Sequence, residues 1–174
     1  KKRTIGLRMK ILKLSKHMKI YNVIISFFLI FTACRENIQE KEEWLSLFNG
    51  KDLQGWVIKC SGNELNENYL NTFRVEDGLL KVSYDDYTEF GNRYGHLFYH
   101  RPFSKYKLRL QYRFRGKKME DSPWWTAYNS GIMIHAQAPE SMPVLPDPED
   151  KSLDLQDHFP VSVECQLLAQ PGNS

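Results

Sequence analysis

The sequence predicts an all-β protein built as an antiparallel β-sandwich. Aromatic residues make up 13% of the 174 residues, and the chain contains ten glycines and eight prolines. This composition, without a long run of Ala, Glu, Lys and Leu, disfavours a helical bundle or a coiled coil. Short stretches of alternating apolar and polar residues, separated by turn signals, recur between residues 44 and 168. Several short strands with turns between them are typical of an antiparallel sandwich.

The strongest strand signal lies at residues 107–115, which read KLRLQYRFR. Apolar and polar side chains alternate strictly along these nine residues. This period of two predicts a strand and disfavours a helix. Residues 130–135 and 161–168 alternate in the same way. Residues 73–75 and 79–82 flank an Asp-Gly turn and therefore predict a hairpin.

Two further strands are predicted at residues 44–48 and 53–58, on either side of an Asn-Gly turn. The stretch 136–160 contains five prolines, so neither a helix nor a central strand is expected there. We predict a long, mobile surface loop. Loops of this length without regular structure are usually functional or disordered.

Charge is divided unevenly along the chain, although the formal net charge is only +3. Residues 1–35 contain nine basic residues and no acidic one, whereas the remainder carries 15 basic and 21 acidic residues, a balance of −6. Proteins that bind a nucleic-acid duplex gather basic residues on the folded surface. The acidic body therefore argues against a nucleic-acid partner, and the basic end is interpreted as a targeting signal.

The N-terminal region has the organisation of an export signal. Lysines precede the apolar stretch 20–31, which is too short to span a bilayer core comfortably. It is followed by Thr-Ala-Cys, an ending that resembles a bacterial lipobox, in which the cysteine carries the lipid. We expect residues 1–34 to be a basic leader and lipoprotein signal peptide with an apolar helix, 35–43 a linker, and 44–174 the domain. The alternative for Cys34 is an incidental thiol at a signal-anchor boundary.

The other two cysteines add little. Cys60 lies in a polar stretch and Cys165 in an alternating strand, so we expect two unpaired thiols. Their pairing would require Cα atoms within about 7 Å of each other. No CxxC spacing indicates a structural zinc site.

Strand parity predicts one polar face that could bind a ligand. If Ile132 and Ile134 point into the core, the residues between and beside them point outward, because successive side chains alternate. The same rule applies to the strand at 161–168, with its valines inward. The predicted face carries Gln111, Arg113, Asn129, His135, Glu164 and Gln166. These side chains offer a base, an acid, amides and a cation, provided that the strands are neighbours. The alternative is an ordinary solvated face with an Arg–Glu pair.

Five segments in this order carry a resemblance to a known family. They are LFNGKDLQGW (47–56), FRVEDGLL (73–80), GHLFYHRPFSKYKLRLQYRF (95–114), NSGIMIHAQAPESM (129–142) and DHFPVSVECQLL (157–168). They resemble the family of 3-keto-disaccharide hydrolase domains. The resemblance implies a concanavalin A-like jelly roll, frequently exported and lipid-anchored, that cleaves glycosides whose sugar has been oxidised at C3.

The sequence departs from that family in two places. Residues 143–153 look like an insertion in a loop that is normally short. The chain also stops at Ser174, shortly after the strand that carries Glu164, whereas family members continue for several more strands. We therefore expect an incomplete jelly roll with uncovered sheet edges and apolar faces.

The implied reaction defines which side chains are needed. A ketone at C3 acidifies the hydrogen on C2, and its removal gives an enolate that expels the aglycone from C1, after which water adds. Such a reaction needs a base near C2 and a cation or donor at the keto oxygen. We predict His135 as the base, Glu164 as its orienter or as the base itself, and Arg113 at the enolate oxygen.

Substrate binding would use the remaining polar and aromatic groups. Gln111, Asn129 and Gln166 suit sugar hydroxyls, and Trp124 and Trp125 could stack on sugar rings. The alternative for the tryptophans is a plug that closes one end of the sandwich.

Other arrangements of the same residues stay open. One alternative for His135 is a strand-end histidine hydrogen-bonded to Glu164, and another is a divalent cation held by the two; no other cofactor is expected. A noncatalytic, lectin-like module and a structural surface lipoprotein are the alternatives to an enzyme. An ordinary glycoside hydrolase is disfavoured, because it needs two carboxylates about 5 to 9.5 Å apart and this strand offers only Glu164.

We predict that Cys34 is lipidated in the cell and anchors an exported protein to the membrane, in the periplasm or at the cell surface. Mass spectrometry of the membrane fraction should show a diacylated cysteine at the mature N-terminus. An intact precursor with an unmodified Cys34 would contradict the prediction.

Overall fold

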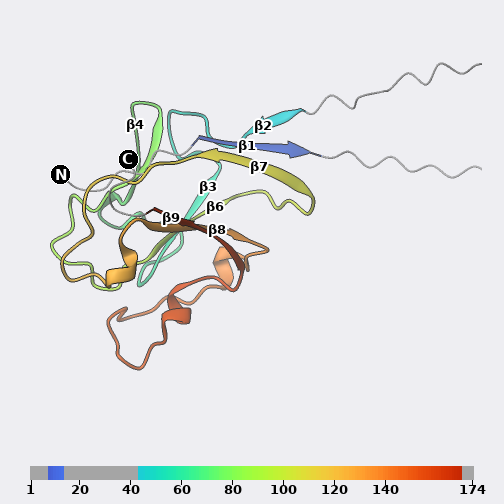
Figure 1. The fold of residues 1–174 in the computed structure, drawn as a ribbon. Coiled ribbons are helices and arrows are strands. Elements are labelled where there is room, and N and C mark those ends of the chain that lie inside the picture. The colour runs from blue at the N-terminus through green and yellow to red at the C-terminus, as the bar shows by residue number, and fades with distance from the viewer. Residues whose placement is uncertain (1–7, 14–42, 170–174) are drawn as a thin grey trace, which may run out of the picture.

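The computed structural model describes residues 8–13 and 43–169, which form an all-β fold (Figure 1). Nine strands and four short 3-10 helices occur in this part of the chain, without an α-helix. Every strand pair is antiparallel, so the predicted fold class is confirmed at this level. No helix in these ranges is long and apolar enough to cross a membrane. The predicted signal helix and Cys34 lie outside the described residues.

The strands form four separate antiparallel sheets. The three-stranded sheet contains β2 (Trp44–Ser46), β1 (Arg8–Lys13) and β7 (Tyr106–Gln111), with β1 in the middle. The pairs are β3 (Trp56–Cys60) with β6 (Gly95–Tyr99), β4 (Phe73–Glu76) with β5 (Leu79–Val82), and β8 (Asn129–Ile134) with β9 (Val163–Leu168). The two continuous sheets of a jelly roll are not formed within the described ranges.

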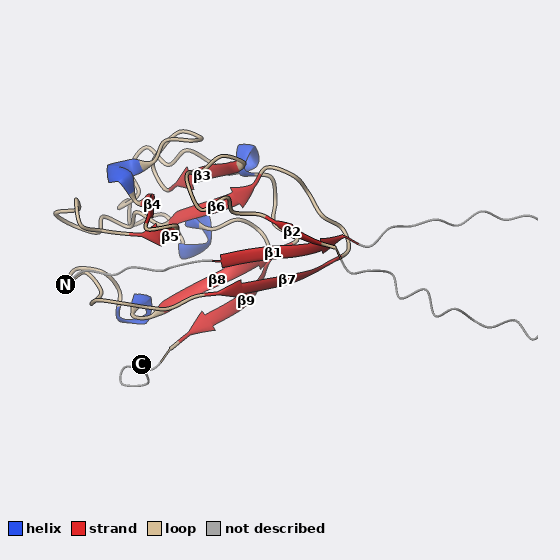
Figure 2. Ribbon diagram, turned by 90° about the horizontal axis from the view of Figure 1, so that it is seen from above, coloured by secondary structure: helices blue, strands red, loops and turns tan. Residues whose placement is uncertain are grey.

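Two layers face each other across the molecule. The β8–β9 ribbon lies below the β2–β1–β7 sheet in Figure 1, and the two overlap when seen from above in Figure 2. The β3–β6 and β4–β5 pairs lie to one side of these layers. Side chains of both layers therefore point into the space between them.

The sequence predicted most strand positions but missed two strands. β6 was not predicted, and neither was β1, which lies in the range that the sequence assigned to a leader. The long strand predicted to reach Arg115 ends at Gln111. Its ladder with β1 stops there, because Gln111 pairs with Arg8, the first residue of β1.

The buried core lies in the half of the fold that contains β3, β4 and β5. Ile58, Cys60 and Phe73 form a cluster against which Tyr69 and Leu97 pack. On β9, in contrast, Val163 is 59% exposed, and Val161 just before it is 78% exposed. The prediction that these valines point into a core is wrong, because no layer covers that face of the ribbon among the described residues.

The proline-rich connection 136–160 is packed against the body over part of its length. It contains the 3-10 helices η3 (Pro139–Ser141) and η4 (Leu155–His158), and Met142, Leu145 and His158 are buried. The other two 3-10 helices are η1 (Tyr69–Asn71) and η2 (Trp124–Thr126). The expected unstructured loop is therefore replaced by two turns of helix held by buried side chains.

The thiols of Cys60 and Cys165 are both free, as predicted. Cys60 is buried, and this burial raises its pKa. Cys165 is exposed on β9.

A buried hydroxyl pair ties the β4 segment to the chain after β5. The Thr72 hydroxyl donates to the Tyr69 carbonyl at 2.5 Å and lies 2.6 Å from the Tyr87 hydroxyl. Because the Thr72 proton is already used, the Tyr87 hydroxyl donates to Thr72. Both side chains are almost fully buried, with 1% and 6% exposure.

We predict that Thr72→Val lowers the free energy of unfolding by about 1–3 kcal/mol, because it leaves the Tyr87 hydroxyl buried without an acceptor. In the Thr72→Val/Tyr87→Phe double variant the loss should be smaller than the sum of the two single losses. Urea unfolding of the four proteins measures this cycle. Strictly additive losses would contradict the proposed pairing.

Candidate functional site

A cavity of about 1200 Å³ lies between the layers. Its walls come from β3 to β9 and from the connections after β7 and β8. On the β7 side it is apolar, with Leu108, Leu110 and Tyr112. On the β8–β9 side it is polar, with Asn129, Glu164 and Gln166. The cavity thus offers an apolar surface and a row of hydrogen-bonding groups to the same ligand.

The polar wall is set by the register of the β8–β9 ribbon. Met133 lies opposite Glu164 and Gly131 lies opposite Gln166, so these four residues share one face. The Glu164 side chain lies across Gly131, where a Cβ atom would come within 2.6 Å of the Glu164 Cγ. Glycine at 131 is therefore what leaves room for the carboxylate in this position.

An amide chain extends the same wall. The Gln166 side-chain amide donates to the Asn129 side-chain oxygen and to the Ser130 carbonyl, the latter at 3.4 Å. The Asn129 amide in turn donates to the Trp125 carbonyl at 3.0 Å. These bonds fix the orientation of both amides and connect the ribbon to the aromatic segment η2.

His135 follows the last residue of β8 and lines the cavity. Its φ of +53° is left-handed, and it is exposed. A non-glycine residue in this region costs roughly 1–2 kcal/mol. Such strained residues cluster at functional sites. His135, just after β8, and Glu164, on the neighbouring strand β9, thus line the same cavity.

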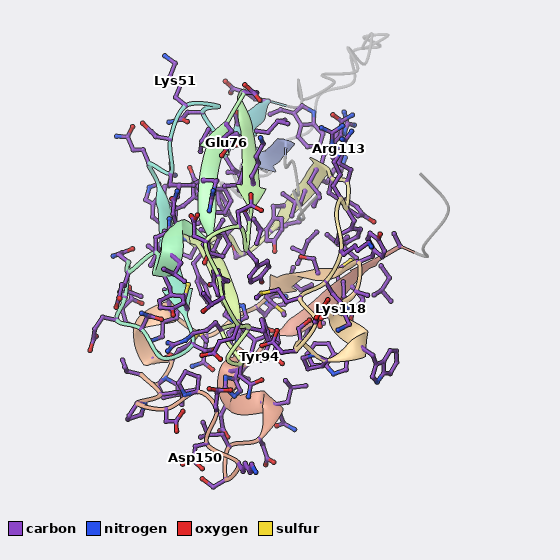
Figure 3. All side chains as sticks on the ribbon, turned by 90° about the vertical axis from the view of Figure 1, so that its left-hand side faces the viewer. Lys51, Glu76, Tyr94, Arg113, Lys118 and Asp150 are labelled. Carbon is purple, nitrogen blue, oxygen red and sulfur yellow. The ribbon has the colours of Figure 1, made fainter. Side chains whose placement is uncertain are left out.

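Two predicted site residues at the end of β7 do not line the cavity. Gln111 and Arg113 are exposed and alternate with Leu110 and Tyr112, which point into it. In Figure 3 Arg113 lies beyond the end of β7, well apart from Tyr94 and Lys118, which line the cavity. The predicted grouping of Gln111 and Arg113 with Glu164 is thus wrong in this structure, because β7 turns its apolar face to the ribbon.

The two tryptophans have different environments. Trp124 is 83% exposed and does not line the cavity. Trp125 lines it and stacks on Tyr94, with ring centroids 5.9 Å apart and an interplanar angle of 2°. Of the predicted stacking pair, only Trp125 is therefore available at the cavity.

A histidine that the sequence analysis did not select also lines the cavity. His96, on β6, bonds through Nε2 to the carbonyl oxygen of His158 at 2.8 Å. Burial lowers the pKa of His96, and the hydrogen bond to the carbonyl opposes this effect in part. Burial likewise lowers the pKa of His158. The only sequence signal for this contact was the presence of both residues in segments that carry the family resemblance.

Residues 43–174 match a family model described as the 3-keto-alpha-glucoside-1,2-lyase-like domain. The chain belongs to this family. The resemblance read from the sequence is thereby confirmed over the range in which it was seen. No curated protein and no solved structure matches the chain.

The lyase-like domain has few candidates for holding a metal ion. No group of three or more His, Cys, Asp or Glu side chains with suitable geometry occurs among residues 8–13 and 43–169. The divalent cation considered for His135 and Glu164 would therefore find no third such ligand in this part of the chain.

The one lysine that lines the cavity of the lyase-like domain is already engaged. The Lys118 ammonium donates to the carbonyls of Met119, Glu120 and Ser122, at 2.9, 3.1 and 2.7 Å. An ammonium has three N–H donors, so none is left for a ligand. Amide and imidazole groups thus dominate the polar chemistry of this wall, together with Glu164.

The lowered pKa values of His96 and His158 predict that acid destabilises the lyase-like domain. Both side chains are neutral when folded, but in the unfolded chain they take up protons once the pH falls below about 6.5. The unfolded state then binds more protons, so stability is complete above that pH and is lost as the pH falls. Urea unfolding at pH 7 and pH 5 should show the loss.

The contribution of His96 to this loss is measured by His96→Gln. Its stability should change less between pH 7 and pH 5, by at most about 1.4 kcal/mol per pH unit. Ser104→Ala, which removes an exposed hydroxyl and no ionisable group, is the control and should keep the wild-type slope. Identical slopes in wild type and His96→Gln would contradict the prediction.

Proposed function

We propose that this protein is an enzyme that cleaves 3-keto-glycosides. It removes the proton on C2, next to the ketone, and expels the aglycone from C1, and water then adds to give net hydrolysis. The observation that supports this most is the presence of Glu164 and His135 on neighbouring strands at one cavity, in a chain that belongs to a lyase-like family.

The residues at the cavity suit distinct roles in this reaction. The base that takes the C2 proton is a titratable side chain that lines the cavity, and Glu164 and His135 are two such groups at the polar wall. The amides of Asn129 and Gln166 bind sugar hydroxyls. Trp125 offers an aromatic surface to the apolar face of a sugar ring. The Asn129 amide uses one N–H for the Trp125 carbonyl and has a second N–H for the keto oxygen, in place of Arg113.

A noncatalytic, lectin-like module is the second candidate. The stacked pair of Trp125 and Tyr94 beside fixed amides favours it, because sugar-binding sites combine aromatic planes with amide donors. The two candidates differ in what Glu164 and His135 do. In a lectin they contribute modestly to affinity, whereas in an enzyme their loss abolishes turnover.

Location and full architecture are part of the same proposal. The basic leader, the apolar stretch 20–31 and Cys34 support export and lipid anchoring. Cleavage before Cys34 would remove β1, so the exported form would keep β2 and β7 without the strand between them. The family resemblance supports a jelly-roll fold.

We predict that the purified protein releases the aglycone from a chromogenic 3-keto-glucoside but not from the unoxidised glucoside. Without the ketone, the C2 hydrogen is too weakly acidic for a histidine or a carboxylate to remove. Glu164→Gln or His135→Ala should lower turnover by about 10²-fold or more, for whichever residue is the base, with substrate binding largely retained.

The matched control is Glu120→Gln, whose side chain is exposed and does not line the cavity. It should retain wild-type turnover. Equal rates on oxidised and unoxidised substrates would indicate an ordinary hydrolase. Binding of the sugar without cleavage of either substrate would indicate the lectin-like module.

A further inference from the structure

The hydrogen bond between β6 and the 136–160 connection fixes the tautomer of His96. A carbonyl oxygen can only accept, so the Nε2 atom of His96 must carry the proton that it shares with His158. The hydrogen bond made by one ring nitrogen determines the state of the other. In the neutral ring, Nδ1 is therefore a free lone pair.

The surroundings of His96 keep this ring neutral. The Phe159 ring meets it edge-on at 5.2 Å, and Phe98 lies at 6.5 Å. A positive charge on His158 would also disfavour protonation of His96. An apolar environment opposes the imidazolium form and supports a neutral acceptor.

The free nitrogen has access to the cavity. His96 is one of the lining residues. Among the described residues, the only enclosed side-chain polar atoms without a partner are Ser61 Oγ and His158 Nδ1. The Nδ1 atom of His96 is not one of them and forms no hydrogen bond within the described part of the chain, so it is not fully enclosed.

We propose that His96 is a further catalytic residue of this cavity and acts through Nδ1 as the base that removes the C2 proton. This inference rests on the proposed function. His96 differs from His135 in being held by a buried partner in a fixed tautomer, whereas His135 is exposed beyond the end of its strand. A base that is oriented and neutral before the substrate arrives needs no reorganisation.

The proposed step balances without an oxidant or a co-reactant. Nδ1 takes the proton from C2, and the C2–H electron pair forms a C2=C3 bond while the ketone becomes an enolate. The enolate re-forms the ketone, a C1=C2 bond forms, and the bond from C1 to the aglycone oxygen breaks. The proton held on His96 passes to that oxygen, so the products are an unsaturated keto sugar and a neutral aglycone.

The variant His96→Gln tests this role. A glutamine amide can reach the position of Nε2 and still donate to the His158 carbonyl, but it supplies no base at the position of Nδ1. We expect kcat on a 3-keto-glucoside to fall by about 10²-fold or more, with KM changed only a few-fold. Arg101→Gln, an exposed neighbour that does not line the cavity, is the control and should keep wild-type kcat.

Exchange of the C2 hydrogen in D₂O, followed by proton NMR, separates this proposal from the proposed function. Exchange by wild type that is lost in His96→Gln supports His96 as the base. Exchange that persists in His96→Gln but is lost in Glu164→Gln overturns the His96 proposal and leaves the proposed function standing. Neither exchange nor cleavage by wild type would refute the proposed function itself.

A measurement on the unaltered protein covers the case in which His96→Gln does not fold. Nitrogen-15 NMR of histidine-labelled wild type at pH 7 should show His96 with a protonated Nε2 and an unprotonated Nδ1. The opposite tautomer, or an imidazolium, would leave no lone pair at Nδ1 and would overturn the proposal.

Discussion

The register of the β8–β9 ribbon determines which side chains reach the cavity. With Met133 opposite Glu164 and Gly131 opposite Gln166, the carboxylate and the amide occupy one face of the ribbon. A shift of one residue would turn every side chain of β9 to the other face. It would bring Val163 and Cys165 to the cavity instead. The small volume of Gly131 supports the observed register, since the Glu164 side chain lies in the space that a Cβ would need.

A second constraint joins segments that are distant in sequence. The bond from His96 to the His158 carbonyl links residues 62 positions apart and fastens the end of η4 to β6. Phe159 packs against both His96 and Tyr94 at the same place, with ring centroids 5.2 and 5.0 Å apart. The connection after β8 is therefore part of the cavity wall, and its position determines how His96 is oriented.

Sequence patterns predicted most of the strands but missed β1 and β6. The hairpin β4–β5 and the strands β7, β8 and β9 were found, because one face of each is polar. β6 was missed because GHLFY shows no alternation, and all five of its residues are partly buried. Pairing partners are non-local, so no pattern within one strand could indicate them.

The same limit explains which site residues were predicted. Parity within the ribbon correctly grouped Asn129, Glu164 and Gln166, since β8 and β9 are hydrogen-bonded neighbours. Parity could not show which face of β7 meets the ribbon, and Arg113 was therefore placed on the wrong side. On the cavity side β7 presents Leu108, Leu110 and Tyr112 instead. A sugar ring has apolar C–H faces and polar hydroxyl edges. An apolar wall opposite an amide wall therefore fits a sugar ring better than two polar walls would. An apolar wall also excludes water, and that strengthens each interaction made by the groups on the opposite wall.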